Sequence, residues 1–216
     1  MSRLLLVTSV CLLSVALAAA APAPKKEATT PLDLQPKANQ KLTENLHSDN
    51  FANNNLAGLK TGKQTLEGIP FAIGEKLIQL GCKSLPDKPE KVEGIKVERA
   101  VTKLHFLHAT GYRTEDETVI GKYIAHYDDN TKEEIEIVYG KDVRDWWNYP
   151  CAPGASRGKV AWKGENEASK GFNATLQLFL MMWENPHPRK KVTSLDFVST
   201  QTEAAPFCVA ITAEAK

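Results

Sequence analysis

Short apolar segments, each separated from the next by Gly, Pro, Asn or Asp, constrain the fold of this chain more than any other feature of its sequence. They begin near Leu66 and are rich in β-branched and aromatic residues, which favours strands over helices. No segment keeps a 3.6-residue periodicity, although KDVRDWW (141–147) is compatible with one short helical turn. The nine segments cover residues 68–74, 76–81, 94–111, 118–127, 133–140, 159–164, 174–183, 191–200 and 206–212. We therefore predict an all-β fold, an antiparallel β-sandwich or jelly roll of about eight or nine strands.

The clearest hairpin in the sequence is IGKYIAHYDDNTKEEIEIVYG. Its tight turn is expected at Asp129–Asn130, because these residue types tolerate a positive φ. A two-residue loop there would place Ile124 opposite Ile135, with Tyr123 near Glu136 on the reverse face. One face of the hairpin is then core and the other polar, and a shift of one residue would exchange them.

The N-terminal region has the pattern of an export signal followed by a linker. Residues 1–20 carry an early charge at Arg3 and then an apolar run that ends in small residues, a pattern typical of a cleavable secretory signal. We expect a secreted, periplasmic or cell-envelope protein. The apolar run is too short to span a bilayer comfortably, so no integral membrane span is expected after cleavage. Residues 21–45 are rich in Pro, Lys, Ala and Thr and are predicted to be a flexible linker, which leaves residues 46–216 as the sandwich domain.

Charge and cysteine content argue against a nucleic-acid-binding protein and against a metal-knuckle protein. The chain has 27 basic and 26 acidic residues, and loss of Arg3 with the signal makes these numbers equal. A nucleic-acid-binding protein would need a clustered basic surface, so no nucleic-acid partner is expected. Cys82, Cys151 and Cys208 remain after cleavage. Three cysteines cannot all pair internally and have no metal-knuckle spacing, so we expect small buried thiols with at most one disulfide.

Candidate metal ligands are better explained as structural residues. His105 and His108 are three residues apart in a predicted strand, where they point to opposite faces and cannot share a metal ion. The three asparagines at residues 53–55 offer amide oxygens to a structural calcium ion, but they lack the ligand spacing of an EF-hand. A turn-forming asparagine cluster is the alternative. We expect no cofactor, with structural calcium left open.

Catalytic motifs are missing from the sequence. It has no Gly-x-Ser-x-Gly elbow, no His-Glu-x-x-His and no glycine-rich phosphate loop. Asp142 and Asp145 form the carboxylate pair of most interest. They would serve a hydrolase only if they converged in one pocket and one of them had a raised pKa. We therefore predict a protein that is not an enzyme.

The tryptophans indicate a binding site. A sugar ring stacks its C–H bonds on an aromatic face, while acid, amide and guanidinium groups bind its hydroxyls. The four tryptophans lie beside such groups, in the three segments RDWWN, AWKGEN and MWENPHP. Adjacent indoles in an extended segment diverge, so at most one of Trp146 and Trp147 should face a ligand. The predicted ligand-binding residues are Arg144, Asp145, Trp146, Trp147, Asn148, Trp162, Glu165 and Asn166.

Four motifs together resemble a known group of domains. They are GIPF at residues 68–71, KLHFLH at 103–108, YGKDVRDWW at 139–147 and APFCVAIT at 205–212. The sequence from Leu66 to Thr212 resembles the galactose-binding-domain-like β-sandwich modules of exported bacterial proteins, which include many carbohydrate-binding modules. The resemblance implies a sandwich fold and a sugar ligand held by loops. Such modules are normally fused to an enzyme; no catalytic domain is expected beside the predicted sandwich, so the module would act alone.

The sequence therefore leaves three functions to compare. The first is a non-catalytic module whose partner is a glycan or another cell-envelope component, bound by loop aromatics and polar groups. The second is a cell-envelope protein-interaction or structural module, in which the aromatic side chains are buried. The third is a glycoside or ester hydrolase, which requires the converging carboxylates described above.

Overall fold

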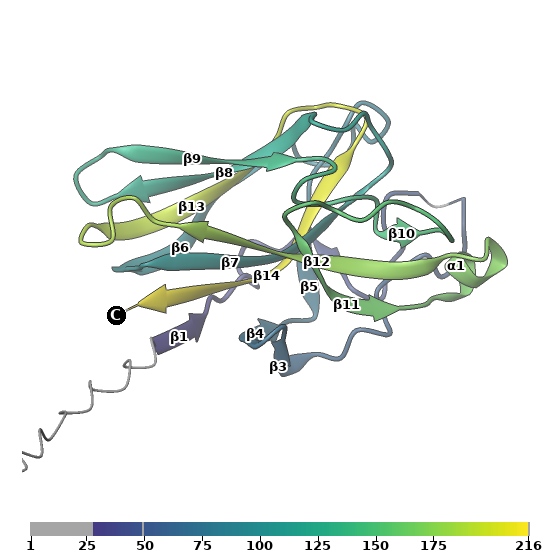
Figure 1. The fold of residues 1–216 in the computed structure, drawn as a ribbon, viewed down its shortest axis with the longest axis horizontal. Helices are drawn as coiled ribbons and strands as arrows, with labels where there is room; N and C mark the ends of the chain where they lie inside the picture. Colours follow the sequence, from purple (N-terminus) through teal and green to yellow (C-terminus); the bar gives the residue numbers. More distant parts are fainter. Residues whose placement is uncertain (1–27, 49, 216) are drawn as a thin grey trace, which may run out of the picture.

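The computed structural model describes residues 28–48 and 50–215, so the predicted signal segment at residues 1–20 lies outside the described residues. Within them the prediction of an all-β antiparallel sandwich is confirmed (Figure 1). The elements are β1 (Ala28–Pro31), β2 (Gln40–Lys41), β3 (Gly62–Leu66), β4 (Ile69–Ile73), β5 (Lys76–Gln79), β6 (Lys91–Ala100), β7 (Lys103–Gly111), β8 (Val119–Tyr127), β9 (Lys132–Val138), β10 (Trp147–Asn148), β11 (Lys159–Gly164), α1 (Glu167–Gly171), β12 (Thr175–Glu184), β13 (Lys191–Ser199) and β14 (Ala205–Ala215).

The strands form two main layers. The larger sheet has the order β10-β12-β7-β14-β5-β2, with β1 added beside β14 and β11 beside β12. The smaller sheet has the order β6-β13-β8-β9, and β3 and β4 form a separate hairpin. In Figure 1 the tips of the β8–β9 and β12–β13 hairpins lie at the left of the molecule, whereas β10 and α1 lie at the right. The sandwich therefore has two ends that are built from different loops.

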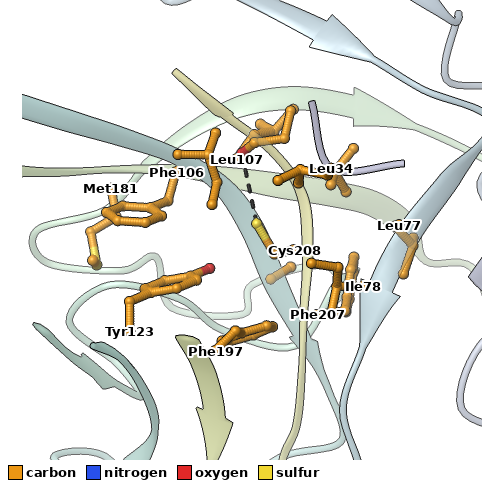
Figure 2. Close-up of a cluster of buried hydrophobic side chains, with 14 of the residues drawn as sticks. Leu34, Leu77, Ile78, Phe106, Leu107, Tyr123, Met181, Phe197, Phe207 and Cys208 are labelled. Atoms are coloured by element: carbon orange, nitrogen blue, oxygen red, sulfur yellow. Dashed lines mark hydrogen bonds between the residues drawn. The ribbon is translucent and has the colours of Figure 1, made fainter. Parts of the chain in front are cut away.

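Aromatic side chains from both layers fill the core (Figure 2). The Tyr123 ring of β8 stacks between Phe106 of β7 and Phe197 of β13, with ring centroids 4.1 and 4.6 Å apart. All three side chains are fully buried. Because Phe106 belongs to the larger sheet and the other two belong to the smaller one, this stack joins the layers.

The predicted hairpin exists, but its register was wrong by one residue. Tyr123 lies opposite Ile135, and Ile124 lies opposite Glu134. The loop holds three residues, because the backbone N–H of Tyr127 donates to the Thr131 carbonyl and the last loop residue takes the positive φ. The extra loop residue exchanges the two faces, so Tyr123 is core and Ile124 is half-buried.

The flexible linker predicted for residues 21–45 does not hold for residues 28–45. Strand β1 pairs with β14, and β2 pairs with β5. Leu32, Leu34 and Leu42 are buried in the core, and the Leu32 N–H donates to the Ile211 carbonyl at 2.8 Å. The three leucines are spread along a proline-containing segment that is otherwise polar. Its composition therefore did not indicate that they pack into the core. Residues 21–27 lie outside the described residues.

Each predicted strand segment overlaps at least one strand, and segment 94–111 divides between β6 and β7. Four short strands, β1, β2, β3 and β10, were not predicted. KDVRDWW, which is compatible with one short helical turn, forms a tight turn near Asp142 followed by extended residues that lead into β10. The helix of the described residues is α1, where Asn166 and Ser169 form a capping box.

Candidate binding site

The loop between β9 and β10 is fixed at its base by a buried carboxylate. Asp142 is fully buried, and its two oxygens accept hydrogen bonds from the Arg157 guanidinium at 2.6 and 2.7 Å. One of them also accepts the backbone N–H of Val138 at 2.9 Å. Gly140 supplies the positive φ of +81° that the turn requires. The chain is therefore held in place where it leaves β9 for the two tryptophans.

The adjacent tryptophans diverge, as their position in an extended segment predicts. Trp146 is 2% exposed and packs against His47 and Phe207, with ring centroids 5.8 and 6.0 Å away. Trp147 is half-buried, and its indole N–H donates to the amide oxygen of Asn54 at 3.0 Å. Trp146 thus belongs to the core beneath the site, and Trp147 is the indole available to a ligand.

Two adjoining cavities open around Trp147. We call the larger one, of about 330 Å³, the polar cleft. It is lined by Arg113, Thr114, Tyr139, Arg144, Asp145, Trp147, Asn148, Tyr149, Pro150, Cys151, Ala152, Pro153 and Gln177. We call the smaller one, of about 180 Å³, the aromatic pocket. It is lined by His47, Ser48, Phe51, Asn54, Tyr112, Asp145, Trp146, Trp147, Tyr149 and Phe172. The two share Asp145, Trp147 and Tyr149.

Asp145 is the central polar group of the site. Its Oδ1 accepts the backbone N–H of Trp147 at 3.1 Å, while its Oδ2 lies 3.8 Å from the Nε of Arg113. Burial raises the pKa of the Asp145 carboxyl to about 6, against the lowering effects of the Trp147 N–H and the Arg113 charge. The carboxyl is therefore mostly ionised at neutral pH. Arg113 also lies over the Tyr149 ring, 4.7 Å from its centroid.

Arg144 lines the cleft but is already paired within the protein. Its guanidinium makes two hydrogen bonds to the Asp116 carboxylate at 2.9 and 2.8 Å, and its Nε donates to the Gly154 carbonyl at 2.8 Å. A side chain with three such bonds is a rigid wall of the cleft. The side chain of Arg113, which also lines the cleft, is 58% exposed and is therefore more accessible than that of Arg144, which is 13% exposed.

Three of the predicted site residues do not line either cavity. Trp162 is half-buried on β11 and packs against the core. Glu165 lies 3.5 Å from Lys170. Asn166 is the N-cap of α1, and its amide donates to the Asn55 carbonyl at 2.9 Å. Asn166 thus supports the loop that carries Phe51, but it does not face the cleft.

Several lining residues come from segments that the sequence did not connect to the tryptophans. Phe51 belongs to the asparagine-rich loop, Phe172 follows α1, and Gln177 lies on β12. Gln177 is held by a hydrogen bond from its amide to the Asp145 carbonyl at 3.1 Å. Tyr149 follows Asn148 directly in the chain, and the sequence could have included it with the predicted residues. Phe51 and Phe172 carry no local signal, because a large aromatic residue after a turn has the same sequence pattern as a core residue.

The candidate metal ligands have other partners. His108 lies 3.3 Å from the Tyr123 hydroxyl of the facing sheet, whereas His105 lies 2.7 Å from the Glu214 carboxylate on β14. The side-chain amides of Asn54 and Asn55 donate to backbone carbonyls, as a turn-forming cluster should. In the described part of the chain, no group of three or more His, Cys, Asp or Glu side chains is placed to hold a metal ion.

The two carboxylates considered for hydrolysis are separated by the structure. Asp145 lines the polar cleft and the aromatic pocket. Asp142 lines a different cavity together with Arg157, Met181 and Trp183. The pair therefore does not meet the convergence that a hydrolase of this kind requires.

The three cysteines described by the structure carry free thiols. Cys82 and Cys208 are buried, and burial raises the pKa of the Cys208 thiol to about 12. Cys151 is exposed and lies in the lining of the polar cleft. The one disulfide that the sequence allowed is not formed among these three residues.

No protein-family model matches the chain, and no curated protein has a similar sequence. The resemblance to galactose-binding-domain-like modules therefore stays a prediction. Within residues 28–48 and 50–215, no helix is both long enough and apolar enough to cross a bilayer.

Proposed function

We propose that this protein is an exported, non-catalytic binding module that recognises a carbohydrate in the polar cleft. The observation that carries the proposal is the position of the Trp147 and Tyr149 rings, 6.3 Å apart, beside the carboxylate of Asp145 and the side chain of Asn148. Aromatic faces stack on the C–H bonds of a sugar, and carboxylate and amide groups bind its hydroxyls. A volume of about 330 Å³ is at the small end of ligand sites, which suits one sugar unit at a time.

The arrangement also supports binding without large rearrangement. The cleft walls are fixed by the Asp142–Arg157 and Asp116–Arg144 pairs, each with two hydrogen bonds. A preformed site loses little conformational entropy when its ligand binds.

A titration of intrinsic tryptophan fluorescence against a glycan panel tests the proposal. We expect the wild-type protein to respond to at least one glycan and Trp147→Ala to weaken binding by about tenfold or more, as removal of a central aromatic contact does. Trp162→Ala is the matched control, because it removes an indole outside both cavities and should leave the affinity unchanged. An unresponsive wild-type protein, or a Trp147→Ala variant that binds as well as the wild type, would refute carbohydrate recognition at this site.

Cys151 provides an independent reporter of occupancy. Its exposed thiol lines the polar cleft, so a bound glycan should slow its alkylation by iodoacetamide. Cys82 and Cys208 are buried internal controls that should react only after unfolding. Alkylation of Cys151 at the same rate with and without a saturating glycan would show that the glycan binds elsewhere.

A cell-envelope protein-interaction module is the second candidate. Phe51 and Phe172 are 39% and 49% exposed and lie together at the edge of the site, which favours an apolar contact with a partner. In that case the protein would capture an envelope protein through these side chains, and Trp147→Ala would weaken the capture without any response to glycans.

A further inference from the structure

The aromatic pocket is left unused by a sugar ring in the polar cleft. Three of the aromatic rings that line it lie against one another: Phe51, Trp147 and Phe172, whose centroids are 5.2 to 5.9 Å apart. Phe51 and Phe172 are exposed, although each has the other within contact distance. Covering such neighbouring rings with an apolar group removes them from water and is favourable.

The size of the aromatic pocket limits what can occupy it. Its volume of about 180 Å³ lies below the range of about 300 to 1,000 Å³ that is usual for a complete small-molecule site. The polar cleft, at about 330 Å³, falls inside that range. The pocket therefore suits a substituent of a ligand whose main part lies in the polar cleft.

Asp145 lies at the boundary between the two cavities. It lines both of them, together with Trp147 and Tyr149. One carboxylate oxygen accepts the Trp147 N–H, and the other is 3.8 Å from the Nε of Arg113, beyond the length of a normal hydrogen bond. A hydrogen-bond acceptor is thus present at the boundary between polar and apolar surroundings. The matching ligand has a hydrogen-bond donor between its polar and apolar parts.

Building on the proposed carbohydrate function, we infer that the ligand is a sugar with an N-acyl group, whose acyl carbons occupy the aromatic pocket and whose amide N–H donates to Asp145. A 2-acylamino sugar has this order of groups: a polar ring, an N–H donor, and then an apolar acyl chain. A hydroxyl at the same position provides the donor but no apolar group. An O-acyl ester provides the apolar group but no donor.

Matched pairs of oligosaccharides test this inference with the full chain. Each pair has the same linkage and length and differs only in the 2-substituent, an N-acetylglucosamine tetramer against a glucose tetramer, and the corresponding galactose pair. We expect the wild-type protein to bind the N-acetyl member of at least one pair about tenfold more tightly, since a single methyl-sized group in an apolar pocket changes affinity by that order. Phe172→Ala should reduce this preference to less than about threefold.

Two further variants keep the test independent of folding. Phe51→Ser opens the same pocket from another segment and should remove the preference in the same way. Met182→Ala removes an exposed apolar side chain that lines neither cavity, and it should leave the preference intact. Lengthening the acyl group from acetyl to propionyl should increase the affinity of the wild-type protein and have no effect on Phe172→Ala.

The outcomes separate this inference from the proposed function. Equal binding of both members of each pair would overturn the N-acyl inference and leave carbohydrate binding in place. A preference that survives in Phe172→Ala and Phe51→Ser would also overturn it, because the acyl group would then lie elsewhere. No response to any glycan, with capture of an envelope protein that Phe172→Ala abolishes, would overturn both proposals in favour of a protein partner.

Discussion

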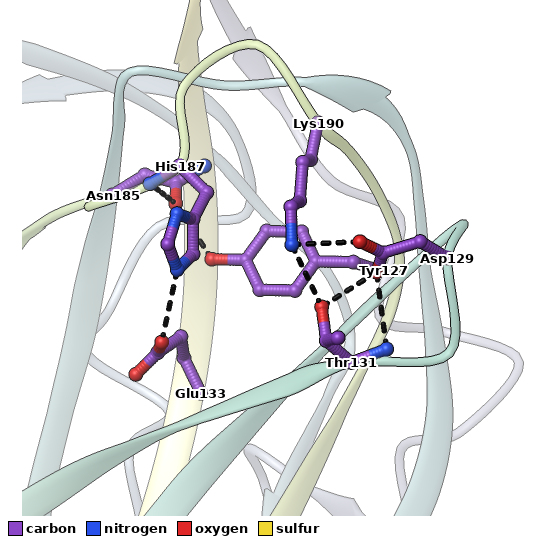
Figure 3. Close-up of polar contacts among 7 residues, drawn as sticks. All are labelled: Tyr127, Asp129, Thr131, Glu133, Asn185, His187 and Lys190. Atoms are coloured by element: carbon purple, nitrogen blue, oxygen red, sulfur yellow. Dashed lines mark hydrogen bonds and ion pairs between the residues drawn. The ribbon is translucent and has the colours of Figure 1, made fainter.

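The two ends of the sandwich use similar residue types for different purposes. At one end, a cluster of polar side chains joins the tips of the β8–β9 and β12–β13 hairpins (Figure 3). We call this the capped end; its members are Tyr127, Asp129, Thr131, Glu133, Asn185, His187 and Lys190. At the other end, aromatic and polar side chains surround the polar cleft and the aromatic pocket. Both ends combine aromatic rings with acids, amides and an Arg or Lys.

At the capped end the partners are internal. The Tyr127 hydroxyl donates to the Asn185 amide oxygen at 2.6 Å, and the Asn185 amide donates to the Val101 carbonyl at 2.9 Å. Lys190 lies over the Tyr127 ring at 5.4 Å and contacts the Asp129 carboxylate at 2.7 Å. These groups satisfy one another and join two hairpins.

At the cleft end some groups stay exposed or lie in an unfavourable environment. Phe51 and Phe172 remain exposed, and the Asp145 carboxyl has a raised pKa. A side chain that is already bonded to its neighbours mainly stabilises the fold. A side chain held in an unfavourable environment gains more interaction free energy when a ligand binds to it. The comparison predicts that substitutions at the capped end change stability without changing binding.

Asn185→Ala should have the largest effect on stability. The Asn185 side chain is buried and makes three hydrogen bonds, to the Tyr127 hydroxyl, the His187 N–H and the Val101 carbonyl. We expect its removal to lower the free energy of unfolding by roughly 3 kcal/mol, because buried partners are left unsatisfied. Urea denaturation measures this change. Tyr127→Phe, which removes one of the three bonds, is the graded control and should cost about 1 kcal/mol. Weakened glycan binding in either folded variant would contradict the separation of the two ends.

Asp145→Asn should have a smaller effect of the opposite sign. The folded-state pKa of about 6 lies above the ordinary value near 3.9, so ionisation destabilises the folded protein, and wild-type stability falls as the pH rises from about 4 to about 6. The neutral amide avoids this loss. We expect Asp145→Asn to be more stable than the wild type by roughly 1 to 2 kcal/mol at pH 7.5, with no difference below pH 4. Denaturation curves at several pH values, with the exposed Glu75→Gln as control, measure the difference. A gain that persists at pH 3.5 would show that burial of the charge is not its cause.

Lys190→Met should have the smallest effect. It removes the ion pair with Asp129 but keeps an apolar stem over the Tyr127 ring. Hydrogen bonds from Lys190 and Thr131 hold the pKa of Asp129 below its ordinary value, so the contribution of the pair is present above about pH 4 and is lost on acidification. An exposed pair is weak and screened by salt, so the change in denaturation midpoint should be smaller than that of Tyr127→Phe and should vanish in high salt. A larger change than that of Tyr127→Phe would mean that this exposed pair, and not the buried amide, holds the hairpin tips together.

Part of the candidate site was predictable from the sequence. Asp145, Trp147 and Asn148 are neighbours in the chain, and the alternation of side chains along an extended segment separates Trp146 from Trp147. Arg144 was also found, but its pairing with Asp116 depends on a residue 28 positions away and could not be read locally. Trp162, Glu165 and Asn166 were predicted because an aromatic residue lies near acid and amide residues in this segment. The same residue types occur together at a helix cap and at a binding loop.

The sequence by itself determined the all-β class and most strand positions, because the alternation and the breaking residues act over a few neighbours. Only the tertiary structure decided the hairpin register, the packing of residues 28–45, and the meeting of Phe51, Phe172, Arg113 and Gln177 around Trp147. These features depend on contacts between segments that are far apart in the chain. Such a contact requires side chains from both segments, so the sequence of either segment alone does not predict it.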